Sequence, residues 1–493
     1  MRPAVLVLMI VLPVAMDAAT FYVDFAGGAD TNSGVAKASP WKHIPGMAGC
    51  TGGCASTVLA GGDTVIFKGG TTWTGSFPWD VQGGQSSAVT YTTDHSWFSG
   101  SAYSQPVFNG QRADMAGGMI TSSASYMVIN DFSVINCGNQ PASVSEQQCL
   151  VFTNTNNVTI SNSTFQTFDW ISVYFRFTSP GSYNNFTFTG NDFSHTSNAI
   201  WIASAQSNTT VHSVTISGNT FHDYHDNMVG GTHGNGLHYY GVPSSDSTQY
   251  LDGMVYCKNR SYGDFTSNGP YTGGNTGGGM TAFFFFESPV SGVVCNNDFS
   301  FNPTQNNMFN SLIMLAGNGN AHKMSLGIYN NSLVNVGTSA MSAAINVQSL
   351  AAGDSVIIKN NIMSSMQYCM YFQDAQSAAA VTSDYNLLNC SSGENDYVNS
   401  LKSYSQWQSL GFDTHSVLGK DPSWVAAPGN EHLNAGSPAI GSGVNLFGLG
   451  ISALNVDADG IARPGSGAWD MGAFGGGSAT GPNPPSGLLL GVR

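Results

Sequence analysis

Three stretches of the chain repeat one pattern: VTISNSTF at residues 158–165, FTFTGNDF at 186–193 and VTISGNTF at 214–221. In each stretch, apolar residues alternate with Thr or Ser, a turn containing Asn follows, and Phe closes the pattern. Alternation with a period of two is typical of a β-strand that has one buried face. Related stretches follow at 254–262, 293–299, 326–333, 356–363 and 381–388. This repetition predicts a repeat protein built from short strands.

Alignment of the repeats places an Asn at the same turn position in nearly every copy. Amide side chains at the spacing of neighbouring strands can hydrogen-bond along the stack, as Asn does in other stacked β structures. Ser163 takes this position in the first full copy. We interpret the column as a structural ladder, made of Asn191, Asn219, Asn259, Asn297, Asn331, Asn361 and Asn386.

A second short strand follows the first one in each repeat. Its second and fourth positions are apolar in every copy and should fill the core, so its third and fifth positions should face outward. Parallel strands need a crossover connection, and coiling of the chain supplies one without helices. The prediction is an all-β, right-handed parallel β-helix, a solenoid with an Asn ladder and capped ends.

The two ends of the chain resemble those of secreted bacterial pectate-lyase-like β-helix proteins. The opening segments are FYVDFAGGADTNSG at 21–34, PWKHI at 40–44 and GDTVIF at 62–67. The closing segments are GSPAIG at 436–441, DADGIARP at 457–464 and DMGAF at 470–474. The resemblance implies a right-handed parallel β-helix. It does not name a reaction, because this superfamily includes lyases, glycosidases, epimerases and non-catalytic adhesins.

The remaining segments follow from composition and spacing. Residues 1–19 have the positive start, apolar stretch and small residues of a secretory signal peptide, so we expect an extracellular protein. We expect an N-terminal cap and first coils at 20–125, the helix core at 126–400, a C-terminal coil and cap at 401–474 and a flexible tail at 475–493. Long loops should interrupt the core at 222–235, 263–281 and 302–311.

An oxidising compartment would make the eight cysteines disulfide candidates. One pair falls on consecutive repeats at equivalent positions, where neighbouring strands lie about 4.8 Å apart, which a disulfide can bridge. That pair is Cys257 and Cys295, and two further pairs flank loops: Cys50 with Cys54, and Cys137 with Cys149.

The charge balance limits the possible partners. The net charge is −15, and only 14 Lys and Arg residues are spread over 493 residues, which argues against nucleic acid as a partner. A polyanionic substrate would need a bound cation such as Ca²⁺. No segment after the signal peptide is apolar for long enough to cross a membrane. We expect a monomer that acts on a polysaccharide.

An aromatic row should line the outward positions of the second strands. Sugar rings present an apolar C–H face that stacks on aromatic rings, and Tyr and Trp add hydrogen bonds. The alternative is that the long loops cover and bury this row. The expected carbohydrate-binding residues are Tyr174, Arg176, Trp201, Phe284, Phe286 and Tyr371.

The loop at 222–238, HDYHDNMVGGTHGNGLH, is the most reactive-looking stretch. It resembles a His-His-Asp-Gly-Ile-His stretch of some β-helix proteins, with HGNGLH at 233–238 in its place. Asn235 stands where that stretch has a carboxylate, which puts an acid role there in doubt. His233 and His238 remain candidates for catalysis.

Two reactions fit these residues. Hydrolysis needs two carboxyl groups, which Asp223, Asp226 and Glu287 could supply. β-Elimination needs a base and a cation that neutralises a uronate carboxylate. The candidate bases are His238, Tyr240 and Lys258, and the candidate cations are Arg260, Arg176 and a Ca²⁺ ion on Asp223 and Asp226.

The sequence therefore predicts an extracellular enzyme that cleaves a polysaccharide by hydrolysis or by elimination. Two alternatives stay open. The same aromatic row could serve a non-catalytic carbohydrate-binding or adhesive protein, or the chain could be a structural surface fibre.

Overall fold

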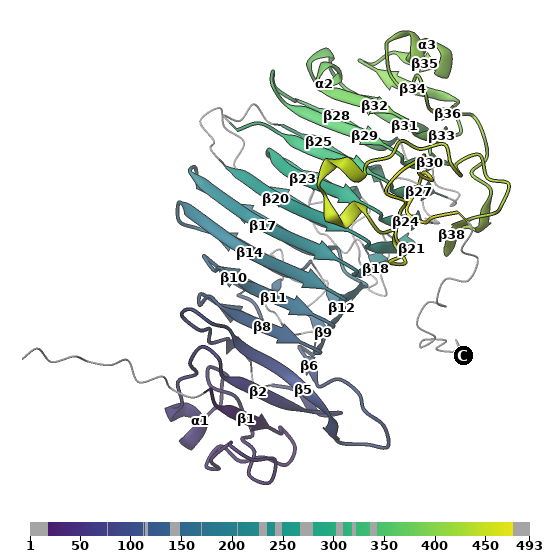
Figure 1. The fold of residues 1–493 in the computed structure, drawn as a ribbon. Coiled ribbons are helices and arrows are strands. Elements are labelled where there is room, and N and C mark those ends of the chain that lie inside the picture. Colours follow the sequence, from purple (N-terminus) through teal and green to yellow (C-terminus); the bar gives the residue numbers. More distant parts are fainter. Residues whose placement is uncertain are drawn as a thin grey trace, which may run out of the picture.

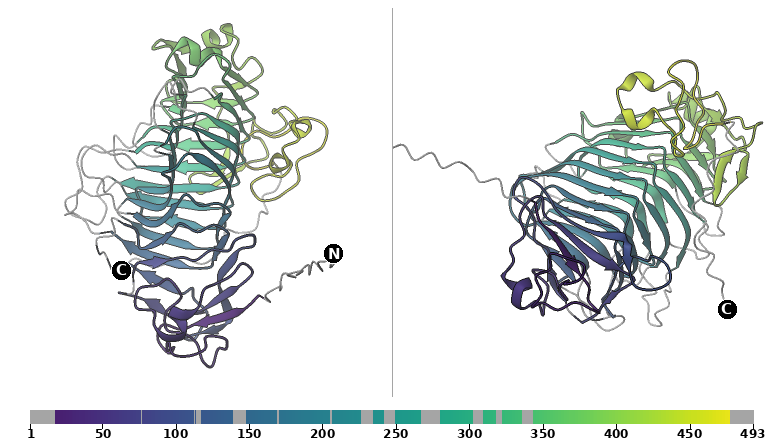
Figure 2. Two further views of the ribbon diagram at one scale, coloured as in Figure 1. Left: turned by 90° about the vertical axis from the view of Figure 1, so that its left-hand side faces the viewer. Right: turned by 60° about the horizontal axis from the view of Figure 1, so that its bottom comes forward.

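The computed structural model describes residues 18–75, 77–111, 113, 117–138, 148–168, 170–204, 206–225, 234–241, 249–266, 280–301, 309–317, 322–335 and 343–476. The chain coils into three long sheets, here sheets A, B and C, and each coil contributes one strand to each sheet (Figures 1 and 2). Neighbouring strands within the stack are parallel, and the coil is right-handed. The parallel β-helix predicted from the repeats is confirmed.

Sheet A begins each coil. Its strands are β1 (Thr20–Val23), β2 (Thr64–Gly69), β5 (Val89–Phe98), β8 (Met127–Asn130), β11 (Val158–Ser161), β14 (Gly181–Thr189), β17 (Thr209–Ser217), β20 (Tyr250–Cys257), β23 (Val290–Cys295), β26 (Ser325–Tyr329), β29 (Ser355–Lys359) and β32 (Val381–Asp384).

Sheet C follows sheet A after the Asn turn. Its strands are β3 (Thr72–Trp73), β6 (Val107–Asn109), β9 (Ser133–Cys137), β12 (Thr164–Phe168), β15 (Asp192–Ser194), β18 (Thr220–His225), β21 (Arg260–Thr266), β24 (Asp298–Phe301), β27 (Ser332–Asn335), β30 (Ile362–Ser364), β33 (Leu387–Asn389) and β36 (Val417–Leu418).

Sheet B completes each coil and contains the second strands of the sequence repeat. Its strands are β4 (Trp79–Asp80), β7 (Ile120–Ser122), β10 (Gln148–Thr153), β13 (Ile171–Phe177), β16 (Asn198–Ser204), β19 (Asn235–Tyr240), β22 (Met280–Phe286), β25 (Phe309–Ala316), β28 (Ala343–Gln348), β31 (Tyr368–Phe372), β34 (Glu394–Tyr397) and the antiparallel β35 (Leu401–Ser403).

The helices are short and lie outside the sheets. They are α1 (Gly52–Ser56), α2 (Ala375–Ala379), α3 (Tyr404–Ser409) and the 3₁₀ turns η1 (Phe447–Leu449) and η2 (Ser452–Leu454). A separate hairpin pairs β37 (Trp424–Ala426) with β38 (Asn430–Leu433). In the part of the chain that the structure describes, no helix has the length and apolar character needed to cross a membrane.

The third sheet is the main addition to the sequence prediction, which expected two strands per coil. The residues just after the ladder Asn, counted there as the end of the first strand, form sheet C. Their apolar side chains stack inside the coil: Phe165 lies 4.8 Å from Phe193, and Phe193 lies 5.1 Å from Phe221, between ring centroids.

The predicted Asn ladder is confirmed at the corner between sheets A and C. The Asn191 side-chain amide donates to Oδ1 of Asn219 at 2.9 Å, and the same bond continues from rung to rung up to Asn386. At Ser163, where the column is interrupted, the backbone N–H still donates to Oδ1 of Asn191 at 3.0 Å. These hydrogen bonds offset the cost of burying the amide groups, because each buried amide has partners on both neighbouring rungs.

All eight cysteines form disulfides: Cys50–Cys54, Cys137–Cys149, Cys257–Cys295 and Cys369–Cys390. The predicted link between consecutive rungs has a Cα–Cα distance of 4.6 Å, the separation of neighbouring strands. Four disulfides fit a protein that folds in an oxidising compartment. The expected signal peptide at 1–19 and tail at 475–493 lie almost entirely outside the described residues.

The C-terminal segment, residues 422–476, returns along the side of the coils and does not stack on their end (Figure 1). It binds at the Asn corner through side-chain amides that donate to its carbonyl oxygens: Asn296 to Ala453 at 3.0 Å, Asn330 to Asp470 at 3.0 Å and Asn360 to Val444 at 2.8 Å. We call it the C-terminal strap.

An apolar cluster and a buried acid pair complete the attachment of the strap. Trp469 is fully buried and packs in one cluster with the Cys257–Cys295 disulfide and Tyr329. Asp298 on β24 and Glu431 on β38 are both buried. Burial, together with the neighbouring charge of Glu431, raises the pKa of Asp298 well above its usual range, so a proton is retained between the two carboxyl groups.

Candidate active site

The outward face of sheet B carries a stack of rings on three consecutive rungs. Tyr174 pairs with Trp201, and Trp201 pairs with His238, in the register of β13, β16 and β19. The Tyr174 and Trp201 rings lie 5.7 Å apart, and the Trp201 and His238 rings are stacked at 4.9 Å with 27° between their planes. Parallel strands in register therefore hold these side chains as one continuous surface.

His238, at the end of this stack, contacts a carboxylate from the next coil. Its Nε2 lies 2.8 Å from Oε2 of Glu287. Glu287 follows β22 directly, and its backbone N–H donates to the Tyr239 carbonyl oxygen at 2.9 Å, which fixes the position of its side chain. The structure thus brings together two residues that are 49 positions apart in sequence.

The pair combines a buried base with a more accessible carboxylate. His238 is only 2% exposed, although its strand position faces outward, while the Glu287 side chain is 23% exposed. Burial lowers the pKa of His238, and Glu287 only partly opposes this. At neutral pH the imidazole is therefore neutral, and its Nε2 can share a proton with the Glu287 carboxyl group. Such a pair can move a proton to or from a ligand.

Three further residues border the ring stack. Tyr240 lies on the same outward face, with its ring 5.8 Å from that of His238. Arg176 is exposed on the rung of Tyr174, two residues further along β13. Trp170, which the sequence analysis did not select, packs edge-on against Trp201 at 5.1 Å. Trp170 lies four residues before Tyr174, so strand alternation places both on the same face. This spacing could have identified Trp170 from the sequence.

The expectation that Phe284 and Phe286 face outward is wrong. Both are fully buried, because Leu237 pairs with Phe284 and Tyr239 with Phe286. The alignment used in the sequence analysis was displaced by one residue in β22, which exchanges the two faces of a strand. Four consecutive Phe residues contain no alternation from which the correct register could be inferred.

His222 and Asp223 belong to a different sheet. The His222 ring is held between two carboxylates, with Nδ1 2.7 Å from Asp223 and Nε2 3.1 Å from Asp192, and it stacks on Tyr262 at 5.1 Å. Burial alone would lower the pKa of His222, but the hydrogen bonds and charges of the two carboxylates raise it to about 9.

This arrangement does not fit the Ca²⁺ site considered for Asp223. The Asp223 carboxylate is engaged by an imidazole that is protonated at neutral pH, and a cation there would face a positive charge. The second expected ligand, Asp226, lies outside the described residues, as does the catalytic candidate His233. Most of the length of the three long loops lies outside the described residues.

Lys258, Arg260 and Tyr371 are also separated from His238. Lys258 and Arg260 flank the ladder at the corner of sheets A and C, where Arg260 lies 3.6 Å from Asp298 and donates to a carbonyl of the strap. Burial lowers the pKa of Lys258. Tyr371 does face outward on sheet B, but four rungs beyond His238, which is about 19 Å at the usual strand spacing.

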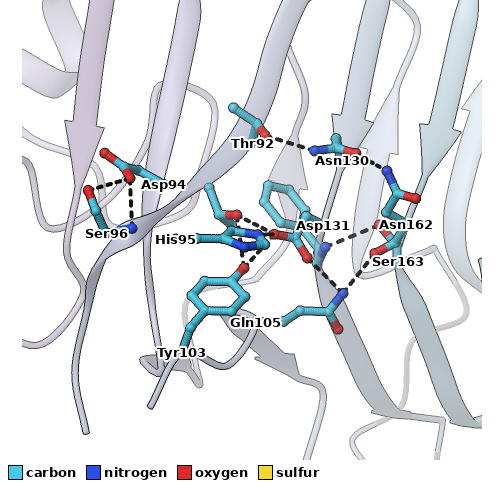
Figure 3. A network of polar contacts seen from close by, with 12 residues as sticks. Thr92, Asp94, His95, Ser96, Tyr103, Gln105, Asn130, Asp131, Asn162 and Ser163 are labelled. Carbon is cyan, nitrogen blue, oxygen red and sulfur yellow. Dashed lines mark hydrogen bonds and ion pairs between the residues drawn. The ribbon is translucent and has the colours of Figure 1, made fainter. Parts of the chain in front are cut away.

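A further polar network lies on the N-terminal coils, centred on Asp131 (Figure 3). Its carboxylate accepts hydrogen bonds from Thr93 and Tyr103, from Gln105 at 3.0 Å, and contacts Nε2 of His95 at 2.7 Å. Burial would raise the pKa of Asp131, but these hydrogen bonds hold it below its usual range. The contacts to this carboxylate all come from the chain segment at 93–105. We therefore interpret the network as an anchor that holds this segment against the coil.

No protein-family model matches the chain, and no curated protein matches it in sequence. Among solved structures, the pectate lyase Pel9A is 12% identical, with a TM-score of 0.45 over 93% of this chain and 98% of its own. The GH136 lacto-N-biosidase from Eubacterium ramulus is 13% identical, with a TM-score of 0.44 over 77% and 67%. XylC in complex with xylose is 9% identical, with a TM-score of 0.43 over 92% and 98%.

These similarities concern the coiled architecture alone, since identities of this size do not carry a function from one chain to another. The assignment of the fold rests on the strand pairing of this chain. The chain is thus a right-handed parallel β-helix.

Proposed function

We propose that this protein is a secreted carbohydrate-active enzyme that cleaves a glycosidic bond on the outward face of sheet B. One observation carries the proposal: the aromatic stack of Tyr174 and Trp201 leads directly to the His238–Glu287 pair. The rings supply a surface for sugar stacking, and the pair supplies proton transfer at the end of that surface. The four disulfides support secretion.

In a hydrolytic reaction, Glu287 would give its proton to the leaving oxygen while the C1–O bond breaks, and the hydroxyl group of a water molecule would add to C1. The remaining proton of that water returns to the enzyme. His238 would position the Glu287 carboxyl group and share its proton. A second carboxyl group is needed on the other side of the bond, and Asp226 is the candidate that the sequence offers.

In an elimination, neutral His238 would remove the proton at C5 of a uronate, a C4–C5 double bond would form, and the C4–O bond would break as its oxygen receives a proton. Arg176, exposed on the same face, would pair with the uronate carboxylate. We derive no step through Ca²⁺, because the Asp223 carboxylate is bound to protonated His222.

Mass spectrometry of products from a panel of neutral and uronate polysaccharides tests the proposal. Products that contain an added water identify hydrolysis, and products with an unsaturated end identify elimination. The Glu287→Gln variant, which keeps the size of the side chain, should lose the activity. If the wild-type protein binds saccharides but cleaves none of them, the non-catalytic carbohydrate-binding function replaces the proposed one.

A further inference from the structure

In the column of outward side chains that contains Tyr174 and Trp201, these two rungs are accessible, and the adjoining described rungs on either side are covered. Tyr174 and Trp201 are partly exposed. On the N-terminal side, Val151 pairs with Tyr174 and is 3% exposed. On the C-terminal side, His238 is 2% exposed. Two later rungs of the same column, Met314 and Asn346, are 8% and 3% exposed.

Described residues close both ends of this two-rung window. At the N-terminal end, the backbone of Gly118 lies against Val151, so closely that a Cβ at Gly118 would be 2.8 Å from Cγ2 of Val151. At the other end, Glu287 contacts His238 at 2.8 Å. The ionisable pair is therefore the end wall of the window and does not lie in the middle of an open groove.

Unused hydrogen-bond donors adjoin the window. Neither indole N–H, of Trp170 or of Trp201, has a hydrogen-bond acceptor in the described part of the chain, although both nitrogen atoms are buried. Buried donors usually have a partner, and an exception calls for an explanation. Sugar hydroxyl groups are acceptors of the right kind, and small movements of the two edge-on rings would expose the donors to them.

We infer that the site takes the end of a carbohydrate chain and holds one or two sugar residues between Val151 and the His238–Glu287 pair. Two rings give stacking surface for about two sugar rings, and the window spans about 10 Å from Tyr174 to His238 at the usual strand spacing. The enzyme is thus exo-acting and releases mono- or disaccharides by one of the balanced steps described above. This inference rests on the proposed function.

A long chain in an open groove would need continuous access along the stack. The described residues contain a cavity of about 450 Å³ on the first coils, lined by residues that include Phe77, Pro78 and Gln111. Gly118 also lines it. A polymer that followed the ring column from Trp201 to this cavity would have to cross Val151, which is covered.

The test follows the lengths of the products over time on xylan, arabinan, β-1,4-galactan and polygalacturonate. Exo action releases only mono- or disaccharides from the first time point, and the polymer shortens slowly. Early products of intermediate length would overturn the inference while leaving the proposed function intact. If nothing is cleaved, the proposed function fails for these polymers, and binding then tests the window alone.

Binding is measured by titration calorimetry with oligosaccharides of two to six units from the same four polymers, using the Glu287→Gln variant. Affinity should stop increasing at about two units. A continued gain up to six units, or a loss of affinity in Tyr371→Ala four rungs away, would overturn the inference. Absence of binding to every oligosaccharide would count against both the window and the proposed function. Trp201→Ala should weaken binding at every length, and Tyr262→Ala, which removes a ring on sheet C, should not.

Discussion

Two histidines of consecutive strands in different sheets, His222 on β18 and His238 on β19, respond to nearby carboxylates in opposite ways. His238 is almost completely buried beside Glu287, and burial outweighs the opposing effect of that carboxylate, so its pKa is lowered. His222 is partly exposed between Asp192 and Asp223, and the two carboxylates raise its pKa to about 9. One is neutral and the other charged at pH 7.

The difference separates a residue suited to proton transfer from one suited to structure. A catalytic acid or base works best with a pKa near the working pH, so that both its protonated and its deprotonated forms are accessible. An imidazolium fixed between two carboxylates stays charged over the physiological range. In the sequence both residues belong to the reactive-looking loop at 222–238, whereas the structure places them on different sheets.

The largest expected effect is on catalytic activity, and it distinguishes the His238–Glu287 pair from the cluster of His222 with Asp192 and Asp223. Glu287→Gln should lower kcat by about 10²–10⁴-fold, the usual contribution of a positioned acid or base. Asp223→Asn, which neutralises a carboxylate of the other cluster, should stay within about threefold of wild type. Both variants are compared on whichever substrate the polysaccharide panel identifies. Equal losses in the two variants would contradict the division of roles.

The next effect concerns the rings that accompany each histidine. Trp201→Ala should weaken carbohydrate binding by about three- to tenfold, which corresponds to the usual value of an aromatic contact. Tyr262→Ala removes the ring that stacks on His222 and should leave affinity unchanged. Titration calorimetry of both variants measures the difference, and an equal loss would mean that sheet C also contacts the ligand.

The two histidines should also affect stability in opposite directions. The raised pKa of His222 stabilises the fold fully below about 6.5, and this contribution is lost as the pH rises through about 9. We expect a loss on the order of 1 kcal/mol, because both carboxylates are more than a third exposed and solvent screens them.

The lowered pKa of His238 acts in the other sense: stability rises with pH and this rise is complete above about 6.5. Calorimetric melting temperatures between pH 5 and pH 10 would show both effects. His222→Gln should remove the decrease between pH 6.5 and pH 9, with His238→Gln as the matched control. A wild-type decrease that persists in His222→Gln would assign it to other groups.

The smallest effect is a change in the titration of His238 itself. Glu287 opposes the lowering of its pKa, so Glu287→Gln should lower the pKa of His238 further while His222 still titrates at about 9. NMR spectra of the two imidazoles as a function of pH would measure this. An unchanged pKa for His238 would contradict the opposing effect of Glu287.

The fold could be predicted from the sequence where residues repeat with a period that strand geometry sets. The Asn column and the link between Cys257 and Cys295 followed from the repeat, because parallel strands keep equivalent residues one rung apart. The same alignment placed Tyr174, Trp201 and His238 on one face. It failed in β22, where four consecutive Phe residues satisfy the core in either register.

The remaining features depend on contacts that no local pattern records. His238 faces outward by its position in β19, yet it is covered. Its contact with Glu287 joins two coils, and the Asp192–His222 contact joins two strands 30 residues apart. Lys258 and Arg260 looked available for catalysis because the sequence does not show that the strap lies at their corner.

The C-terminal strap also changes how the molecule should come apart. In a solenoid each repeat contacts only its neighbours, so unfolding can start at an end and proceed one repeat at a time. Here the C-terminal strap is bound to Asn296, Asn330 and Asn360, on three successive coils of the interior. Loss of the last coils must therefore wait until the strap has detached. A linear array thereby gains the cooperativity of a closed loop, because its last coils cannot unfold separately while the strap is attached.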